Sequence, residues 1–208
     1  TLDSKRGAAD MMQTHFSLDT MLYQITSLLL EVAAGLIAGT CLLRLYMQYQ
    51  RISMSVRSGN PLAKFIFALT DWLVLPLRRV IPAAGRWDLA SLVGAFLMQL
   101  ALHAALWLLR GANESVVSVG IYAAFGLARM AISGMTALVI IYAILSWVQT
   151  RSMAADFLER LVLPVLIPIR RVVPLVGGID LSPLVLLLIL QVAGIVLGSI
   201  QAAVLFAI

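Results

Sequence analysis

Two short basic segments, each flanked by prolines and followed by an aspartate, contain the residues of this chain that are best suited to polar chemistry. The first reads LPLRRVIPAAGRWDL from Leu75, and the second reads IPIRRVVPLVGGIDLSP from Ile167. The guanidinium group of arginine forms charge-assisted hydrogen bonds with phosphate and with carboxylate. Both segments therefore predict contacts with anionic groups.

The arginine pairs have two candidate roles, which can coexist. The four residues are Arg78, Arg79, Arg170 and Arg171. In the first role they contact lipid phosphates at a membrane boundary, where each contact is worth about 1 kcal/mol. In the second role an arginine of each pair binds the aspartate that follows it, Asp88 or Asp180, and fixes the chain where it returns to the membrane.

Prolines on both sides of each arginine pair predict breaks in the helix. They are Pro76 and Pro82 in the first segment and Pro168 and Pro174 in the second. Proline lacks an amide donor and disfavours helix in the residue before it. We therefore expect residues 77–81 and 169–173 to be short pieces between breaks, at the membrane interface or against protein.

The residues after the second arginine pair predict a turn into a helix. Gly177 and Gly178 allow a sharp turn. Asp180 or Ser182 can cap the next helix, and Pro183 suits its first turn if Ser182 is the cap.

The composition indicates a membrane protein. Of the 208 residues, 62% are hydrophobic and only 12% are charged, with a mean hydropathy of +0.99. A helix needs about 20 apolar residues to cross a bilayer, and four stretches are long enough. They are roughly residues 22–49, 89–109, 119–147 and 184–206. The net charge of +5 lies beside these apolar runs, so lipid headgroups explain it better than nucleic acid.

The distribution of lysine and arginine predicts the orientation. The two long connections hold ten such residues, and the opposite side holds three. The positive-inside rule then places both connections in the cytoplasm and both termini on the outer side of the membrane. Residues 1–16 are polar and are expected to form a flexible tail outside the fold.

A surface helix is expected before the first arginine pair. Asn60 is its candidate cap, and Pro61 suits its first turn. The apolar residues at helical spacing are Leu62, Phe65, Ile66, Leu69 and Leu73. Lys64 and Asp71 fall on the opposite face, which predicts an amphipathic helix lying on the membrane surface.

The second half of the chain repeats the first. At an offset of 92 residues the identical positions of the first half are Pro76, Arg78, Arg79, Pro82, Gly85, Asp88, Leu89 and Gln99. We therefore predict an all-α membrane protein built from two parallel helical hairpins, residues 17–110 and 111–208, about a pseudo-twofold axis along the membrane normal. Each hairpin is expected to carry one amphipathic interfacial helix.

Two charges inside the apolar stretches form a second candidate site. Upstream of the basic segments the repeats align at an offset of 98, which places Glu31 on Arg129. Either the two form a bridge across the axis, or each extends separately to the outer headgroups. Arg44 is expected to extend toward the cytoplasmic headgroups. His103 has no ligand partners at metal-binding spacing and is expected to be packed against protein or adjacent to lipid.

The basic segments resemble the YggT family of small bacterial inner-membrane proteins, which has relatives in chloroplasts. IPIRRVVPLVGGIDLSP is similar to the family signature LPIRR.VP..GGIDLSP, and LRLYMQYQR from Leu43 resembles a motif of its first half. The resemblance covers about residues 22–205. The first copy departs from the pattern at Trp72, Arg86 and Ser91, so we expect the second copy to be the sharper form. The resemblance implies roles in envelope organisation, in osmotic and potassium homeostasis or, in chloroplasts, in cytochrome maturation.

The residues predict no enzyme, cofactor or metal site, because no nucleophile has a base and no carboxylates are paired. One hypothesis is a non-catalytic scaffold or assembly factor, with lipids and other membrane proteins or further copies of the chain as partners. The alternative is a component of ion transport, for which Gln99, Gln191, His103 and Thr40 would be a thin polar lining.

Overall fold

The computed structural model describes residues 2–52, 62–82, 85–112, 115–148, 152–173 and 180–207. This part of the chain contains six helices and no strand. The helices are α1 (Leu2–Tyr49), α2 (Ala63–Val80), α3 (Leu89–Leu109), α4 (Val116–Trp147), α5 (Met153–Arg170) and α6 (Ser182–Phe206).

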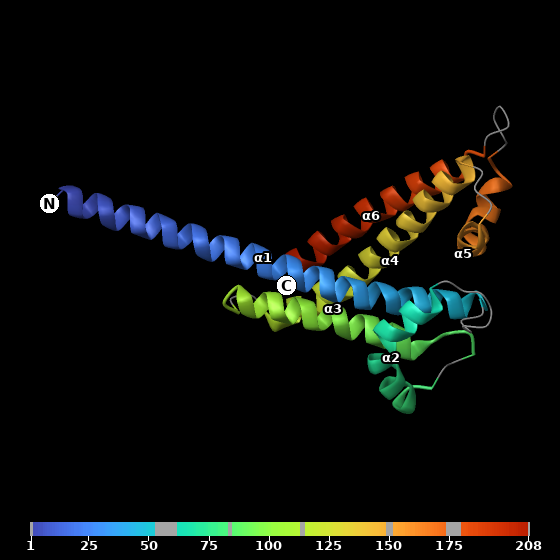
Figure 1. Ribbon diagram of the computed structural model, residues 1–208, viewed down its shortest axis with the longest axis horizontal. Helices are drawn as coiled ribbons and strands as arrows, with labels where there is room; N and C mark the ends of the chain where they lie inside the picture. Colours follow the sequence, from blue (N-terminus) through green and yellow to red (C-terminus); the bar gives the residue numbers. More distant parts are fainter. Residues whose placement is uncertain are drawn as a thin grey trace.

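Four of these helices are long and apolar enough to cross a membrane, as the sequence predicted. The spans are Thr20–Tyr49, Leu89–Leu109, Val116–Ser146 and Ser182–Phe206. Each pairs with its neighbour in an up-and-down hairpin, α1 with α3 and α4 with α6 (Figure 1). The protein is therefore an all-helical membrane protein.

The starts of three helices follow from side chains that bind free amides. The carboxylate of Asp88 accepts from the amide of Ser91 at the start of α3, and Ser115 and Ser152 accept in the same way for α4 and α5. Each bond satisfies a donor that has no partner within the helix. Before Asp88 the chain turns at Gly85, whose φ of 62° suits a residue without a Cβ. The caps thus fix where the spans begin.

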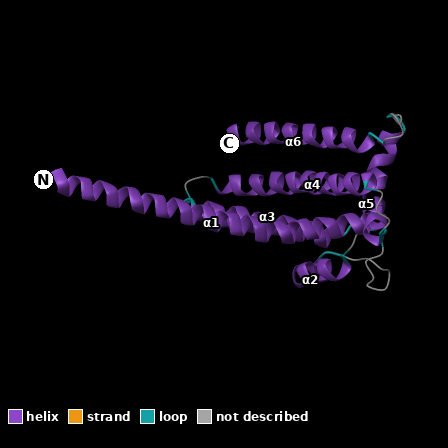
Figure 2. Ribbon diagram, turned by 45° about the horizontal axis from the view of Figure 1, so that its top comes forward, coloured by secondary structure: helices purple, strands orange, loops and turns teal. Residues whose placement is uncertain are grey.

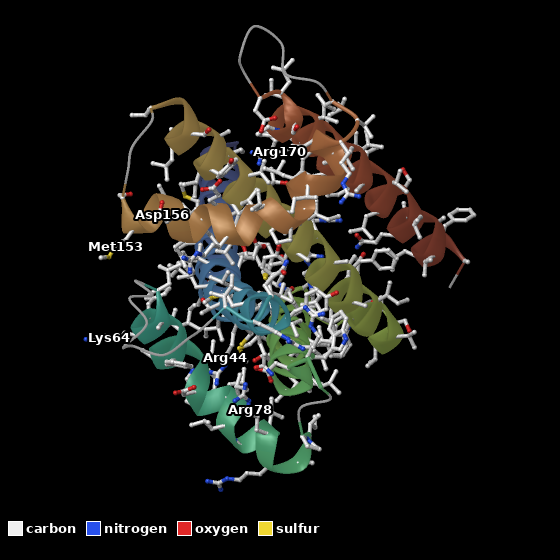
Figure 3. The ribbon with its side chains drawn as sticks, turned by 90° about the vertical axis from the view of Figure 1, so that its right-hand side faces the viewer. Arg44, Lys64, Arg78, Met153, Asp156 and Arg170 are labelled. Atoms are coloured by element: carbon white, nitrogen blue, oxygen red, sulfur yellow. The ribbon has the colours of Figure 1, made fainter. Side chains whose placement is uncertain are left out.

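The short helices α2 and α5 lie at the same end of the bundle and across the direction of the long helices (Figures 1 and 2). Figure 3 views this end directly and shows both helices along their length. Ile66 of α2 and Phe157 and Leu161 of α5 belong to one buried core cluster with Met47 of α1. Both basic segments are therefore at one end of the molecule.

The expected breaks at Pro76 and Pro168 are absent. Pro76 lies inside α2, and α5 contains both Pro164 and Pro168. All three prolines are on the exposed side of their helices, where water or headgroups can bind the carbonyls that lose their donors. The arginine pairs consequently occupy the last turns of α2 and α5, where the partial negative charge of the helix end favours cations.

The end of α2 does follow the expectation for a residue before proline. Ile81, which precedes Pro82, is extended with φ −118° and ψ 94°. The expected cap at Asn60 and Pro61, and Pro174, Gly177 and Gly178 of the second segment, lie outside the described residues.

The N-terminal segment is helical from Leu2 and continues into the first span. In Figure 1 this part of α1 projects beyond the other helices. The expectation that residues 1–16 form a flexible tail outside the fold concerned mobility rather than secondary structure, and it stays a prediction.

The two hairpins meet chiefly through α3 and α4. Gly126 of α4 permits this approach, since a Cβ there would lie 2.8 Å from Gln99 Oε1 and 3.0 Å from His103 Nε2. A twofold axis would pack α1 against α6 in the way it packs α3 against α4, and α1 and α6 are not among the extensive contacts. The two hairpins are therefore packed asymmetrically.

The substitution Gly126→Leu should destabilise the α3–α4 contact, because the added carbons would displace the side chains of the buried Gln99 and the half-buried His103. Overpacking of this kind typically costs about 1 to 3 kcal/mol. Gly134→Leu on the same helix is the matched control, since nothing lies within 4 Å of a Cβ at that position. Thermal unfolding in detergent should show a lower midpoint for the first variant alone, and equal midpoints would contradict this packing.

Candidate functional site

The first basic segment forms a buried ion pair. Arg78 Nη2 lies 2.5 Å from Asp88 Oδ2, and the Asp88 side chain has no exposed surface. Ser91 adds a hydrogen bond from its hydroxyl to the same oxygen at 2.7 Å. Arg78 also donates to Gln48 Oε1 of α1 at 3.1 Å. The pair thus ties the last turn of α2 to the start of α3 and to α1.

A second arginine, Arg44 of α1, reaches the same site. Its Nη1 donates to Thr70 Oγ1 at 2.7 Å and to Asp71 Oδ1 at 2.6 Å, and its Nε lies 3.8 Å from Asp88 Oδ2. The Arg44 side chain is only 3% exposed. The expectation that Arg44 extends to the headgroups was wrong, because α2 brings Asp71 within reach.

Two cations and two carboxylates balance within this cluster, which we call the α2 anchor: Arg44, Arg78, Asp71 and Asp88, with Thr70 and Ser91. Burial alone would raise the pKa of Asp88, but the hydrogen bonds from Arg78 and Ser91 outweigh it and hold the pKa below its ordinary value. The carboxylate of Asp88 is therefore ionised at neutral pH, and each charge has a partner of opposite sign. Such pairing is the condition for keeping charges out of water.

The second basic segment forms a smaller and more open counterpart, the α5 anchor of Arg170, Asp180 and Tyr142. Arg170 Nη2 lies 2.8 Å from Asp180 Oδ2 and 2.9 Å from the hydroxyl of Tyr142. Asp180 also accepts from the amide of Ser182 at 2.9 Å. Burial would raise the pKa of Asp180, but the bonds from Ser182 and Arg170 leave it below its ordinary value. Its side chain is 27% exposed.

Asp180, not Ser182, satisfies the amide at the start of α6. The side chain of Ser182 is buried, and Pro183 occupies the first turn of the helix. Of the two caps that the sequence allowed, the aspartate is the one observed.

The first copy, rather than the second, is the more elaborate. Arg44 aligns with Tyr142 at the offset of 98, and Ser91 aligns with Pro183 at the offset of 92. Ser91, a departure from the family pattern, is thus a member of the α2 anchor. The expectation that the second copy is sharper does not hold for the described contacts.

Arg86, a second departure, binds the end of α1. Its Nη2 donates to the carbonyl of Tyr49, the last residue of that helix, at 3.0 Å. Its guanidinium lies 4.9 Å from the centre of the Tyr49 ring, and Trp87 packs on the same ring at 4.8 Å. A cation at this position satisfies a free carbonyl and favours the helix end.

The second arginine of each pair is on the outside. Arg79 and Arg171 are both exposed, while Arg78 and Arg170 beside them hold the aspartates. Figure 3 shows Arg44 and Arg78 close together at α2 and Arg170 near α6. In each basic segment, therefore, the first arginine forms an ion pair with an aspartate and the second lies on the exposed surface.

Glu31 and Arg129 lie at the opposite end of the bundle and line one hollow. The ion pairs within 4.0 Å among the described residues do not include them; Arg129 Nη2 donates to Gln201 Oε1 of α6 at 2.6 Å instead. The direct bridge that the sequence allowed is thus not formed. The described part of the chain also contains no group of three metal-binding side chains.

A family model supplies the decisive comparison. The model described as CCB3/YggT matches residues 20–109 and 121–201, which include both anchors. The chain belongs to the YggT family. The resemblance inferred from the basic segments is thereby confirmed.

Relatives in several bacteria share most of the chain with this YggT family member. A Vibrio alginolyticus protein from the region 3′ of proC is 35% identical over 84% of this chain and 94% of its own length. The uncharacterized protein YggT of Escherichia coli K12 is 32% identical over 84% of this chain and 90% of its own length. Protein PA0392 of Pseudomonas aeruginosa is 33% identical over 78% of this chain and 83% of its own length. No solved structure matches the chain.

Removing the charge of Asp88 should destabilise this YggT family chain more than removing that of Asp180. Asp88→Asn leaves two arginines against one carboxylate in a buried site, a change that costs about 3 to 5 kcal/mol. Asp180→Asn acts on a partly exposed pair and should cost about 1 kcal/mol or less. Thermal unfolding in detergent measures both, and a larger effect at Asp180 would refute the ranking.

The pH dependence of stability in the wild type and in Asp88→Asn tests whether Asp88 is charged in the folded protein. Because folding lowers its pKa, the stabilisation is present above the unfolded value of about 3.9 and disappears as the pH falls through the folded value. The stability gap between wild type and Asp88→Asn should be constant from pH 5 to 8 and close below pH 4. A gap that closes near neutral pH would show that Asp88 is not held as a carboxylate.

Proposed function

We propose that this protein is a non-catalytic scaffold of the bacterial inner membrane, which uses the exposed arginines of α2 and α5 to bind acidic segments of partner membrane proteins. The observation that carries the proposal is that the two arginines of each pair have different surroundings. Arg78 and Arg170 are engaged by aspartates, while Arg79 and Arg171 are exposed beside them.

The anchors support this proposal because they reduce the freedom of the exposed arginines. Each exposed arginine follows directly after one whose guanidinium is held in an ion pair, at the end of a helix that contributes side chains to the buried core. A cation presented from a fixed backbone loses less entropy on binding than one on a mobile loop.

The shared core supports a two-point contact. Residues of α2 and α5 pack in one cluster, and the hydroxyl of Tyr46 on α1 donates to the carbonyl of Leu161 on α5 at 2.7 Å. The two basic helix ends are thus held relative to one another. Two linked contacts of this kind bind a partner more tightly than either alone, provided that the partner spans both.

The ion-transport alternative has less structural support. Gln99 is 3% exposed and bonded to Met130 Sδ at 3.6 Å, whereas Gln191 is on the exposed surface of α6. The two glutamines therefore do not line one path within a single chain. A role in potassium or osmotic homeostasis would need further copies of the chain to complete the path.

The double substitution Arg79→Ala with Arg171→Ala should remove partner proteins that co-purify with the wild type after crosslinking in native membranes. The reason is loss of the two exposed cations without damage to the anchors. Lys64→Ala with Arg160→Ala is the matched control, because it removes two exposed cations from the same two helices. Quantitative mass spectrometry of the crosslinked material is the measurement.

Three results distinguish the possibilities. Loss of partners in the arginine variant alone supports the scaffold. Equal loss in both variants shows a general electrostatic effect, and loss of bound anionic lipid without loss of protein shows that the arginines are lipid anchors. Either of the last two results contradicts the proposal.

The proposed orientation has its own test. The excess of lysine and arginine in the connections that contain α2 and α5 places them in the cytoplasm and both termini in the periplasm. A phosphatase that is active only in the periplasm should therefore be active when fused after Ile208. A fusion at residue 56, in the first long connection, should be inactive, and the reverse pattern would invert the topology.

A further inference from the structure

The outer face of α6 corresponds to a surface that is buried in the first hairpin. Figures 1 and 2 show α6 at one edge of the bundle, beside α4. At the offset of 92 residues the counterpart of α6 is α3. Gln99, Leu102 and Leu106 of α3 are buried. Gln99 contacts Met130 of α4, so the first hairpin uses this face of its second helix to contact another hairpin.

The same face of the second hairpin is open in the described part of the chain. The counterparts of the three buried residues are Gln191, Gly194 and Gly198. Gln191 lies on the exposed surface. A Cβ added at either glycine would have no neighbouring side chain or helix within 4 Å among the described residues. The surface that the first hairpin buries is therefore available on the second.

Gln191 lies near the middle of the bilayer. It is nine residues after the start of α6 at Ser182, which is about 14 Å at 1.5 Å per residue, and the hydrocarbon core is about 30 Å thick. None of the hydrogen bonds within the described residues involves Gln191. A primary amide in hydrocarbon loses its bonds to water, and only another polar group can replace them. The amide therefore favours a partner that brings a polar group to the same depth.

A second copy of the chain supplies such a group by symmetry. Copies inserted in the same orientation can pair about a twofold axis along the membrane normal, which brings equivalent residues together at equal depth. A primary amide contains both donors and an acceptor, so Gln191 of each copy can donate to the other. Gly194 and Gly198 on the same side of α6 allow the two helix backbones to approach closely. Lipid tails offer no hydrogen bond at this depth.

The first helix of a second copy fits this face less well than its α6. The contact between α3 and α4 depends on Gly126, which leaves room for Gln99. At the offset of 98 the counterpart of Gly126 on α1 is Leu28, whose side chain is exposed. A leucine at this position would occupy the space that Gln191 needs. The glycines therefore favour contact of α6 with α6.

We propose that the protein forms a twofold homodimer in the membrane through α6. The Gln191 amides of the two copies are hydrogen-bonded to one another, and the helices are in close contact at Gly194 and Gly198. The inference does not depend on the proposed scaffold function. Such a dimer has the ends of α2 and α5 of both copies on the same side of the membrane, which doubles the number of exposed arginines on that side.

The strength of association is measured in liposomes by single-molecule photobleaching of the full chain, with one dye on a short tag after Ile208, over a series of protein-to-lipid ratios. The wild type should pass from monomer to dimer as the ratio rises. Gln191→Leu and Gly198→Leu should each weaken association by about tenfold, because they remove the amide bonds and the close approach. Gln191→Asn keeps the amide and should retain most of the association. Gly134→Leu on α4 is the matched control, since its surroundings are equally open.

A second measurement locates the interface independently of affinity. Ala202 lies three turns beyond Gln191 on the same side of α6, whereas Ile200 lies on the opposite side. Both side chains are exposed. Oxidation of native membranes should therefore cross-link Ala202→Cys into a dimer and leave Ile200→Cys monomeric. Cys41 is buried and should not react.

The results separate this dimer from other arrangements. Weaker association in the two leucine variants of α6 alone, with cross-linking of Ala202→Cys alone, supports the proposal. Chains that stay monomeric at every ratio, a dimer that both leucine variants leave unchanged, or an equal loss in Gly134→Leu would overturn it. Equal cross-linking of Ile200→Cys, or capture of a different membrane protein by Ala202→Cys in place of a second copy, would also overturn it.

Discussion

The carboxylate of Asp88 is fully buried at the junction of α1, α2 and α3, and the surrounding structure is arranged to keep it charged. Arg78 approaches from α2, Arg44 from α1 and Ser91 from α3 itself. An isolated carboxylate in such a place would cost several kcal/mol. The cost of burying the Asp88 charge is therefore offset only when all three helices are in position together. The ion cluster thus favours the correct arrangement of α1, α2 and α3 as well as stabilising it.

Both halves of the chain pair an aspartate with an arginine, but the two ion pairs are buried to different degrees. In the second half a neutral hydroxyl, that of Tyr142, stands where the first half has Arg44, and the aspartate keeps contact with solvent. The additional cation of the first half is matched by Asp71, whose counterpart at the offset of 92 is Leu163. The first anchor thus contains one more cation and one more carboxylate than the second, and its Asp88 is buried whereas Asp180 is partly exposed.

Much of the fold could be predicted from the sequence because lipid imposes strict conditions on it. Long apolar runs predicted the four spans. The repeated basic segments allowed one arginine of each pair to bind the aspartate that follows it, as an alternative to lipid contact, but did not say which arginine. The continuity of α2 through Pro76 could not be predicted, since it depends on which side of the helix faces solvent.

The partners of Arg44 also could not be predicted from the sequence pattern. An arginine near the end of an apolar helix normally extends to the headgroups, and only the tertiary position of α2 supplies Asp71 and Thr70 as partners. The helical spacing placed Asp71 on the polar face of a surface helix, which predicted contact with solvent rather than with Arg44. Glu31 and Arg129 line one hollow, and the bond from Arg129 to Gln201 of α6 was not visible in the sequence pattern.

The hydrogen bond from Tyr46 to the carbonyl of Leu161 joins residues 115 positions apart. Met47, one residue further along α1, is buried in a core to which α5 contributes more buried side chains than any other helix. During synthesis the first hairpin therefore leaves the ribosome before α5 exists. The side chains of Tyr46 and Met47 at the end of α1 are covered only when α5 has been made. The buried core at this end of the first hairpin is consequently complete only after the second half of the chain has been synthesised.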